Sequence, residues 1–531
     1  MNQQGIIFTD TAILASKYQC RREEVQGLLF DFIRLSENFN HLWYLLDAAE
    51  YGKELGKTPG WYDYNEVISD FKMGMGLPSG PSLCLFIIGG DDVIPIPMIA
   101  DPYGTSDGLM PTDMAYCFSG LFLADLMDGA ERVLSLDYVR NNVSRLPLED
   151  GPLNSTLEED LQAYFNLCSL YANDGIDVEG VVMTANSDWI PASVTMSHHL
   201  PLLFDEADVS VVRKGMYVSP ELMADNPDSQ RTFLSEIKKA GMLLFNLHGA
   251  DCPGYSGFYS TDEAFSIPMM QESNARVVNT VACFGARYHG YNRADSMLLS
   301  SLFGAGKLLF CGSLIPVPMI ADEDQDVPRG VHMNSGSGSE KLMPIFCLYQ
   351  FMGVPAGRAL LQAKLDYFNS FRRIERDDFS LATAMMFCLY GNPMLSVQPD
   401  ERVIEAAKNK FVFPDAPGTI QSIQEPLSLK VKNRIMMTGK DNSSSILSEI
   451  RGMVDANIDA IHITIQNQLY MRLGLSPRTL ASIDSYTQKS RTGYIEEGFV
   501  YTYRDRNKVY DNLTIVEMGK DGRIIKVVKT K

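Results

Sequence analysis

The sequence predicts an α/β fold with a mostly parallel sheet, and three observations support this prediction. Short apolar runs of strand length recur between residues 83 and 400. Segments with helical periodicity separate most of these runs. The runs are continuously apolar, which is typical of strands whose two faces are both covered by helices. Strands that alternate with helices in this way build a parallel sheet.

The first α/β unit begins with mixed sequence and then becomes regular. Residues 23–35 and residues 41–51 show helical periodicity, and residues 83–89 form the first apolar strand. An amphipathic helix at residues 157–172 leads from this unit into a second one.

The second unit alternates strands and helices more clearly. Its predicted strands are residues 180–184, 209–212, 242–247, 277–282 and 308–312. Its predicted helices are residues 194–204, 230–239, 294–303, 342–353, 355–371 and 380–390. A polar, Gly/Ser-rich segment at residues 321–341 interrupts the pattern, and loops of that length in compact domains are usually functional or disordered.

The pattern changes after about residue 400, where a small α+β domain is predicted at residues 401–531. Residues 401–420 resemble a linker, with prolines at positions 414 and 417. The predicted strands are residues 427–437, 458–465, 498–503, 513–517 and 524–528, and the predicted helix is residues 444–457. This region carries no catalytic signature, so we expect it to bind an activating or regulatory protein partner.

The length and charge of the chain exclude several functions. A chain of 531 residues is too long for one hydrophobic core, so we expect roughly two to four domains. Its formal charge is -20, whereas nucleic acids and anionic membrane surfaces attract basic proteins. We therefore expect no nucleic-acid partner and no membrane partner, while a cationic ligand is favoured at long range.

The nine cysteines are scattered and odd in number, and most lie inside apolar stretches. This pattern indicates buried thiols in a reducing compartment rather than a disulfide framework. The N-terminus shows no signal-peptide pattern, and the chain has no apolar run of the roughly 18 residues that a membrane helix needs. These features predict a cytoplasmic protein.

Two predicted strands end on chemically capable side chains. Residues 242–247 lead into His248 and Gly249, and residues 277–282 lead into Cys283. Open parallel sheets place active sites at such strand ends. A thiol beside a base is the arrangement of a cysteine nucleophile, and the N–H groups of Gly249 and Cys283 are candidates for an oxyanion hole.

These strand ends resemble those of the caspase-like clan of cysteine peptidases, which carry His-Gly and Ala-Cys pairs there. More of the chain is similar to the gingipain-like family in that clan. Residues 87–95, IIGGDDVIP, are similar to its Gly-Asp-Ile-Pro turn. Residues 143–147, VSRLP, are similar to its Gly-Arg-Leu-Pro segment, with Ser144 replacing glycine. Residues 390–395, YGNPML, are similar to its Gly-Asp-Pro segment, with Asn392 replacing aspartate.

The resemblance implies a caspase-like α/β/α sandwich in two subdomains, a non-catalytic one at residues 1–150 and a catalytic one at residues 151–400. It implies a bacterial cysteine endopeptidase that acts on proteins or peptides, with His248 as general acid/base and Cys283 as nucleophile. The chemistry of this family needs no metal or other cofactor, although a structural calcium ion is compatible with it. Latency until activation is also compatible with this assignment.

The resemblance also suggests where the substrate binds. In the family, the segment after the 308–312 strand borders the pocket for the residue before the cut, which here is formed by Ser313, Leu314 and Ile315. Asp188 is the candidate acid for selecting a basic residue there, and the acidic chain favours such a preference. Residues 321–341 are a candidate activation or autoprocessing loop.

Two other functions are compatible with the same residues. His248, Cys252, Cys283 and His289 are four side chains of the types that bind zinc, although their spacing fits no common zinc motif. The chain is alternatively a catalytically silent caspase-like scaffold that binds a partner protein through residues 401–531. The presence of both His248 and Cys283 favours the peptidase.

Overall fold

The computed structural model describes most of the α/β region and four strands of the C-terminal region. The described residues are 3–51, 60–101, 109–118, 138–178, 180–185, 216–218, 227–250, 256–259, 263–317, 338–370, 378–401, 480–489, 495–505, 512–519 and 524–529. Contacts divide the chain into two compact units, Met1–Ser428 and Leu429–Lys531. The predicted boundary at residue 150 therefore falls inside the first unit and remains a prediction.

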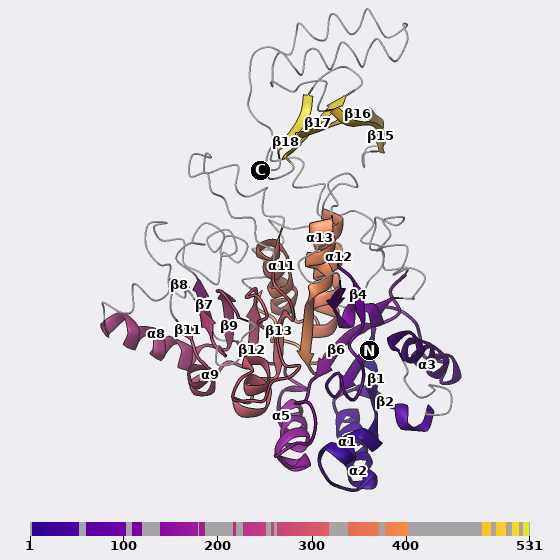
Figure 1. Cartoon of the computed structure of the whole chain (residues 1–531), viewed down its shortest axis with the longest axis vertical. Helices are drawn as coiled ribbons and strands as arrows, with labels where there is room; N and C mark the ends of the chain where they lie inside the picture. The colour runs from indigo at the N-terminus through magenta and orange to yellow at the C-terminus, as the bar shows by residue number, and fades with distance from the viewer. Residues whose placement is uncertain are drawn as a thin grey trace, which may run out of the picture. The chain divides into compact units, whose positions relative to one another are not determined.

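The first unit contains a ten-stranded sheet in the order β2-β1-β3-β6-β14-β13-β12-β9-β7-β8. Its strands are β1 (Gln3–Thr9), β2 (His41–Asp47), β3 (Leu83–Ile88), β6 (Asn142–Leu146), β7 (Val181–Ala185), β8 (Met216–Val218), β9 (Met242–Asn246), β12 (Val277–Thr280), β13 (Leu309–Ser313) and β14 (Phe387–Gly391). Figure 1 shows β1, β2 and β3 in indigo to purple and β9, β12 and β13 in magenta, as parts of one sheet. The fold class is therefore α/β.

The sheet consists of two parallel halves that run in opposite directions. β14 is antiparallel to β13 but parallel to β6, and every other neighbouring pair of described strands in this sheet is parallel. The carboxyl ends of β9, β12 and β13 therefore lie at one edge of the sheet. The carboxyl ends of β1, β2, β3 and β6 lie at the opposite edge.

Helices cover both faces of the sheet. The described helices of this unit are α1 (Thr11–Lys17), α2 (Arg22–Glu37), α3 (Trp61–Gly74), α5 (Ala163–Tyr171), α8 (Pro227–Lys239), α9 (Ile267–Glu272), α10 (Met297–Leu299), α11 (Ser339–Phe351), α12 (Ala356–Ser370) and α13 (Asp378–Met386). On β1, Phe8 contacts Tyr64 of α3, with ring centroids 5.7 Å apart. Gly5, on the other face of β1, packs against Trp43, whose ring contacts Phe32 of α2.

Most predicted elements of the first unit are confirmed. The structure contains the predicted strands at residues 83–89, 180–184, 242–247, 277–282 and 308–312, each within one residue at its start. It also contains the predicted helical segments at residues 23–35, 157–172, 230–239, 294–303, 342–353 and 355–371. The predicted elements at residues 194–204 and 209–212 lie outside the described residues.

Two predicted helices are wrong, wholly or in part. Residues 41–51 form strand β2 and a short helical turn, because the aromatic-rich segment pairs with β1 in a fully parallel register. Of residues 380–390, only the first part is helical, because α13 ends at Met386 and the chain continues into β14. A short, continuously apolar run has the same appearance in a buried helix and in a buried strand.

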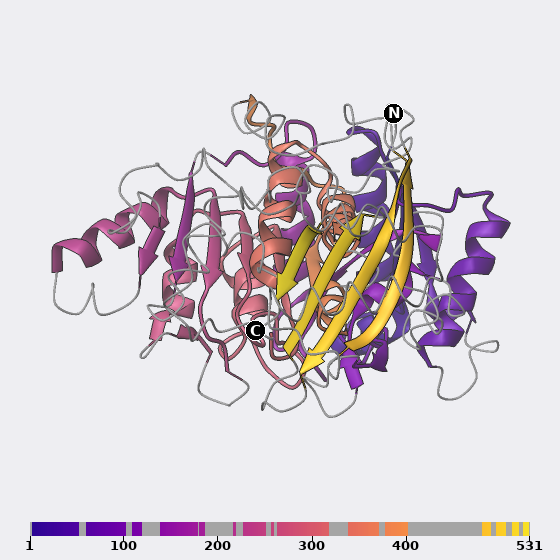
Figure 2. The same ribbon diagram turned by 90° about the horizontal axis from the view of Figure 1, so that it is seen from above.

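The C-terminal unit contains an antiparallel sheet of four described strands, drawn in yellow in Figure 2. They are β15 (Leu480–Lys489), β16 (Ile495–Asp505), β17 (Asn512–Gly519) and β18 (Ile524–Lys529). The predicted strands at residues 498–503, 513–517 and 524–528 are confirmed, whereas β15 was not predicted. The predicted helix at residues 444–457 and the strands at residues 427–437 and 458–465 lie outside the described residues.

A buried arginine holds together the segments that carry the family resemblance. Arg145 on β6 is completely buried and forms a two-point ion pair with Asp113, with N–O distances of 2.9 and 2.7 Å. Its Nη1 also donates to the carbonyl oxygens of Gly89, at 3.0 Å, and Ile94, at 2.8 Å. The guanidinium therefore stabilises the turn at residues 87–95.

The third of these segments reaches the same place. Tyr390 of β14 pairs with Arg145, and the Ser144 hydroxyl donates to the carbonyl oxygen of Gly391 at 2.8 Å. Ser144 thus makes a hydrogen bond between β6 and β14, the two neighbouring strands at the inner side of the first half of the sheet.

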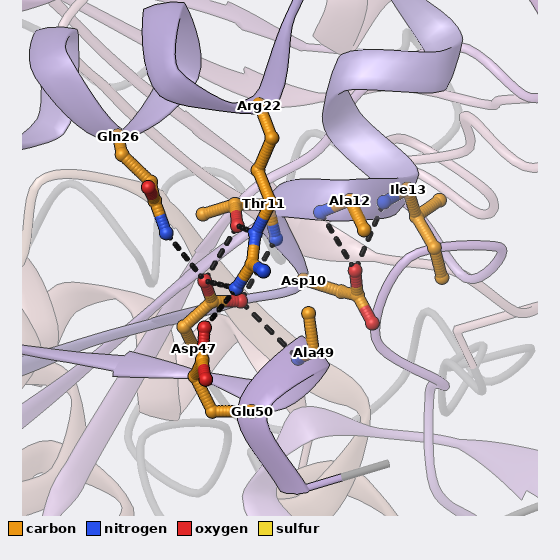
Figure 3. Close-up of polar contacts among 9 residues, drawn as sticks. All are labelled: Asp10, Thr11, Ala12, Ile13, Arg22, Gln26, Asp47, Ala49 and Glu50. Atoms are coloured by element: carbon orange, nitrogen blue, oxygen red, sulfur yellow. Dashed lines mark hydrogen bonds and ion pairs between the residues drawn. The ribbon is translucent and has the colours of Figure 1, made fainter.

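A second polar cluster connects the start of α1, the start of α2 and the end of β2 (Figure 3). The Asp47 carboxylate accepts hydrogen bonds from the Thr11 N–H at 3.0 Å, the Ala49 N–H at 3.2 Å and Arg22 Nη2 at 2.8 Å. Burial alone would raise the pKa of Asp47, but hydrogen bonds from Thr11 and Arg22 outweigh it and hold the pKa below its usual range.

Asp47→Asn is expected to lower the free energy of unfolding at pH 7 by about 2–3 kcal/mol, because hydrogen bonds to a charged acceptor are lost. A lowered folded-state pKa contributes stability above the unfolded value of about 4, and this stability disappears as pH falls through the folded value. Urea unfolding from pH 7 to pH 3 should therefore show the wild type and Asp47→Asn converging in acid. Glu24→Gln, which removes an exposed ion pair with Arg21, should change stability little at any pH.

Candidate active site

The two candidate catalytic turns lie against each other at one edge of the sheet. β9 and β12 are parallel neighbours, with Phe245 opposite Thr280, so the residues that follow them leave the sheet side by side. A Cβ placed on Gly249 would lie 1.8 Å from the carbonyl oxygen of Cys283. This position therefore accepts glycine only, and the His248 turn is in backbone contact with the Cys283 turn.

His248 lies on an exposed turn that is held through its backbone. Its N–H and carbonyl both pair with Tyr259 at 2.8 Å, which connects the turn to the hairpin of β10 (Phe258–Tyr259) and β11 (Glu263–Phe265). The side chain is accessible to solvent, as a general acid/base that meets a substrate must be.

The Cys283 thiol is partly buried beneath the segment that follows β13. The Val317 N–H donates to Sγ at 3.2 Å, and the Val317 carbonyl oxygen lies 3.7 Å from the same sulfur. Burial raises the pKa of the Cys283 thiol, and the Val317 N–H opposes this change with a smaller effect. In this conformation the protonated thiol is favoured over the nucleophilic thiolate.

The turn after Cys283 has a strained backbone. Phe284 adopts a φ of 52°, in the left-handed region that non-glycine residues seldom occupy. The Phe284 N–H donates to the Ile315 carbonyl at 3.1 Å, and the Ala286 N–H donates to the Ser313 carbonyl at 2.9 Å. Strained residues of this kind cluster at functional sites. They persist because neighbouring contacts hold the strained backbone in place.

The predicted pocket residues lie beside the nucleophile. Ser313 and Ile315 are buried and contact the Cys283 turn through their backbones, whereas Leu314 is partly exposed. Leu314 is therefore the member of this segment that is best placed to contact a substrate. Asp188, the candidate acid of the pocket, lies outside the described residues, as does most of the loop at residues 321–341.

The structure describes the alternative zinc set only in part. No group of three or more His, Cys, Asp and Glu side chains that could hold a metal occurs in the described part of the chain. In the candidate zinc set, Cys252 lies outside the described residues, and His289 Nδ1 lies 3.1 Å from Asp150 Oδ2. The Asp91 carboxylate accepts the Ile96 N–H at 2.6 Å and so caps its own turn.

Two residues that contact the candidate site, Val317 and Arg287, were not predicted from the sequence. Val317 contacts the Cys283 sulfur, and Arg287 Nη1 donates to the Ala250 carbonyl at 2.6 Å. Val317 carries no chemical signal, because its backbone makes the contact. Arg287 lies four residues after Cys283. Its charge in an otherwise uncharged segment was the only sign in the sequence that it belongs to the site.

Among the described helices, none combines the length and apolar character needed to cross a membrane. Comparisons of the chain with models of protein families, with curated proteins and with solved structures give no match.

Proposed function

We propose that the chain is a caspase-like, gingipain-like cysteine endopeptidase in a latent form. One observation carries the proposal: the turn with the candidate general acid/base and the turn with the candidate nucleophile are in contact through Gly249 and the Cys283 carbonyl. A base beside a thiol is the arrangement that activates a cysteine nucleophile for acyl transfer. We include in the proposal a two-subdomain arrangement, a preference for a basic residue before the cut, and a cytoplasmic location.

The proposed reaction has two steps. His248 takes the proton of Cys283, and the thiolate attacks the peptide carbonyl carbon to form a C–S bond. The N–H groups of Gly249 and Cys283 would stabilise the oxyanion. His248 then gives its proton to the leaving amine as the C–N bond breaks, and water hydrolyses the resulting thioester to release the acid and regenerate the thiol.

The contact of Val317 with the sulfur supports latency. A shift of residues 313–317 would uncover Sγ for a substrate carbonyl, and it would also remove part of the burial that raises the pKa of Cys283. A partner protein that binds residues 401–531, or calcium, is a candidate trigger. The same contact also fits the second candidate, a silent scaffold, because it leaves the thiol protonated.

A fluorogenic peptide panel that varies the residue before the cut, assayed with calcium, EDTA and reductant, tests the proposal. Under the condition that releases latency, the wild type should cleave and Cys283→Ala should not. Cys20→Ala is the matched control, because Cys20 is also a partly buried thiol, and it should cleave like the wild type. If no peptide is cleaved and iodoacetamide modifies Cys283 no faster than Cys20 under every condition, the scaffold is the correct assignment.

A further inference from the structure

We propose that Arg287 is a positioning residue that holds the His248 turn against the Cys283 turn. This inference rests on the proposed function and adds a residue to its machinery. Arg287 lies in the chain segment that follows Cys283, and its Nη1 donates to the carbonyl oxygen of Ala250 at 2.6 Å. Ala250 follows His248 by two residues, so this hydrogen bond joins the two candidate catalytic turns through a side chain.

Arg287 is itself held at several points. Its N–H donates to the Phe284 carbonyl at 2.9 Å, and its carbonyl accepts from the Ser296 hydroxyl at 2.5 Å. The guanidinium carbon lies 3.5 Å from the centroid of the Tyr291 ring, and the residue is only 8% exposed. A planar guanidinium that stacks on an aromatic ring while it donates to a carbonyl has little freedom to move.

The His248 turn therefore has three backbone anchors. Tyr259 pairs with the backbone of His248, the Cys283 carbonyl packs on Gly249, and Arg287 binds Ala250. Of these three, only the contact from Arg287 is made by a side chain, so it is the one that a substitution removes directly. Loss of this hydrogen bond should loosen His248 relative to Cys283 and leave the rest of the sheet intact.

Arg276 provides a matched control. Its Nη1 donates to the Gly306 carbonyl at 2.7 Å, and its guanidinium lies 6.0 Å from the centroid of the Tyr171 ring. The chemistry therefore matches that of Arg287. Arg276 precedes β12, however, and so lies at the amino end of the strand whose carboxyl end leads to Cys283.

The experiment compares the wild type, Arg287→Met, Arg287→Lys and Arg276→Met under the conditions in which the wild type cleaves peptide. Arg287→Met should lower kcat/KM by about 10²-fold through kcat, because misplacement of a reacting group by about 1 Å has an effect of that size. In the same variant, the acid limb of the pH profile of kcat/KM should move to higher pH. Alkylation of Cys283 at pH 6.5 should slow by about tenfold, since one pKa unit changes the thiolate fraction tenfold.

Arg287→Lys keeps a charged donor and should recover part of the loss, whereas Arg276→Met should leave the pH profile and the alkylation rate unchanged. Equal effects of Arg287→Met and Arg276→Met, or a wild-type pH profile in Arg287→Met, would overturn the inference. If Arg287→Met does not fold, Arg287→Gln takes its place, and a wild-type pH profile in that variant overturns the inference. If the wild type itself neither cleaves nor shows a reactive Cys283, the proposed function fails instead.

Discussion

Gly249→Ala is expected to lower kcat/KM for peptide cleavage by at least about 10²-fold and to change the alkylation rate of Cys283. The added methyl carbon would lie 1.8 Å from the Cys283 carbonyl oxygen, whereas real Cβ atoms essentially never come closer than 3.0 Å to another heavy atom. The His248 turn and the Cys283 turn must therefore separate by roughly 1 Å, a displacement that typically has an effect of this size on rate. Steady-state kinetics and mass-spectrometric alkylation measure the two effects.

Gly27→Ala is the matched control, because a Cβ on Gly27 of α2 would meet nothing within 4 Å. It should retain full activity and gain up to about 1 kcal/mol of stability, since alanine favours the helix over glycine. A Gly249→Ala variant with wild-type kinetics would contradict the contact between the two turns and, with it, the observation that carries the proposed function.

The second large effect is expected from Asp113→Ala, which should lower the free energy of unfolding by about 3–5 kcal/mol. Arg145 is completely buried, and Asp113 is the carboxylate that neutralises it through two hydrogen bonds. Removal of one partner leaves an uncompensated charge in the core, because arginine does not deprotonate in proteins. Chemical denaturation monitored by tryptophan fluorescence measures the loss.

Asp31→Ala provides the comparison, because Asp31 and Arg34 form an exposed ion pair on α2. The free energy of unfolding of the Asp31→Ala variant should differ from that of the wild type by less than about 1 kcal/mol. If Asp113→Ala does not fold, the double variant Asp113→Leu with Arg145→Met should restore folding, since an apolar pair of similar volume avoids the buried charge. A single Asp113→Ala variant as stable as Asp31→Ala would show that the ion pair does not stabilise the core around Arg145.

The candidate site was predictable where local sequence determines position. Continuous apolar runs bounded by Gly, His and Cys identify β9 and β12, and parallel pairing places their carboxyl ends at one edge. His248 and Cys283 are therefore expected to be close once the runs are recognised as neighbouring strands. Contact between Gly249 and the Cys283 carbonyl gives this expectation a specific geometry.

Elements whose structure depends on distant partners were not predictable. Residues 41–47 have the periodicity of a helix, but pairing with β1 makes them a strand. β14 continues directly from α13, so the apolar run at residues 380–390 contains no residue that signals the change from helix to strand. Local sequence patterns therefore fail to predict the secondary structure of segments that can form either a helix or a strand, because tertiary pairing decides between the two.

Contacts made by the backbone were also hidden from the sequence. Val317 reaches the Cys283 sulfur through its N–H, so any residue except proline could make the contact at that position. Arg145 pairs with Asp113 across 32 positions of chain, and nothing in either residue identifies the other as its partner. Such pairs become visible only when the order of the strands is known.

The position of β14 in the sheet, between β6 and β13, has a consequence for synthesis on the ribosome. β6 pairs with β14, and Ser144 is separated from Gly391 by 247 positions. At about 5–20 residues per second, the ribosome would take roughly 12–50 s to synthesise that interval. Throughout this time the nascent N-terminal half carries an unpaired parallel edge, which is the kind of surface that recruits wrong partners. β14, the last described strand of the first unit, therefore closes the edge of the earlier strand β6. A chaperone that shields β6 during translation would raise the yield of folded protein.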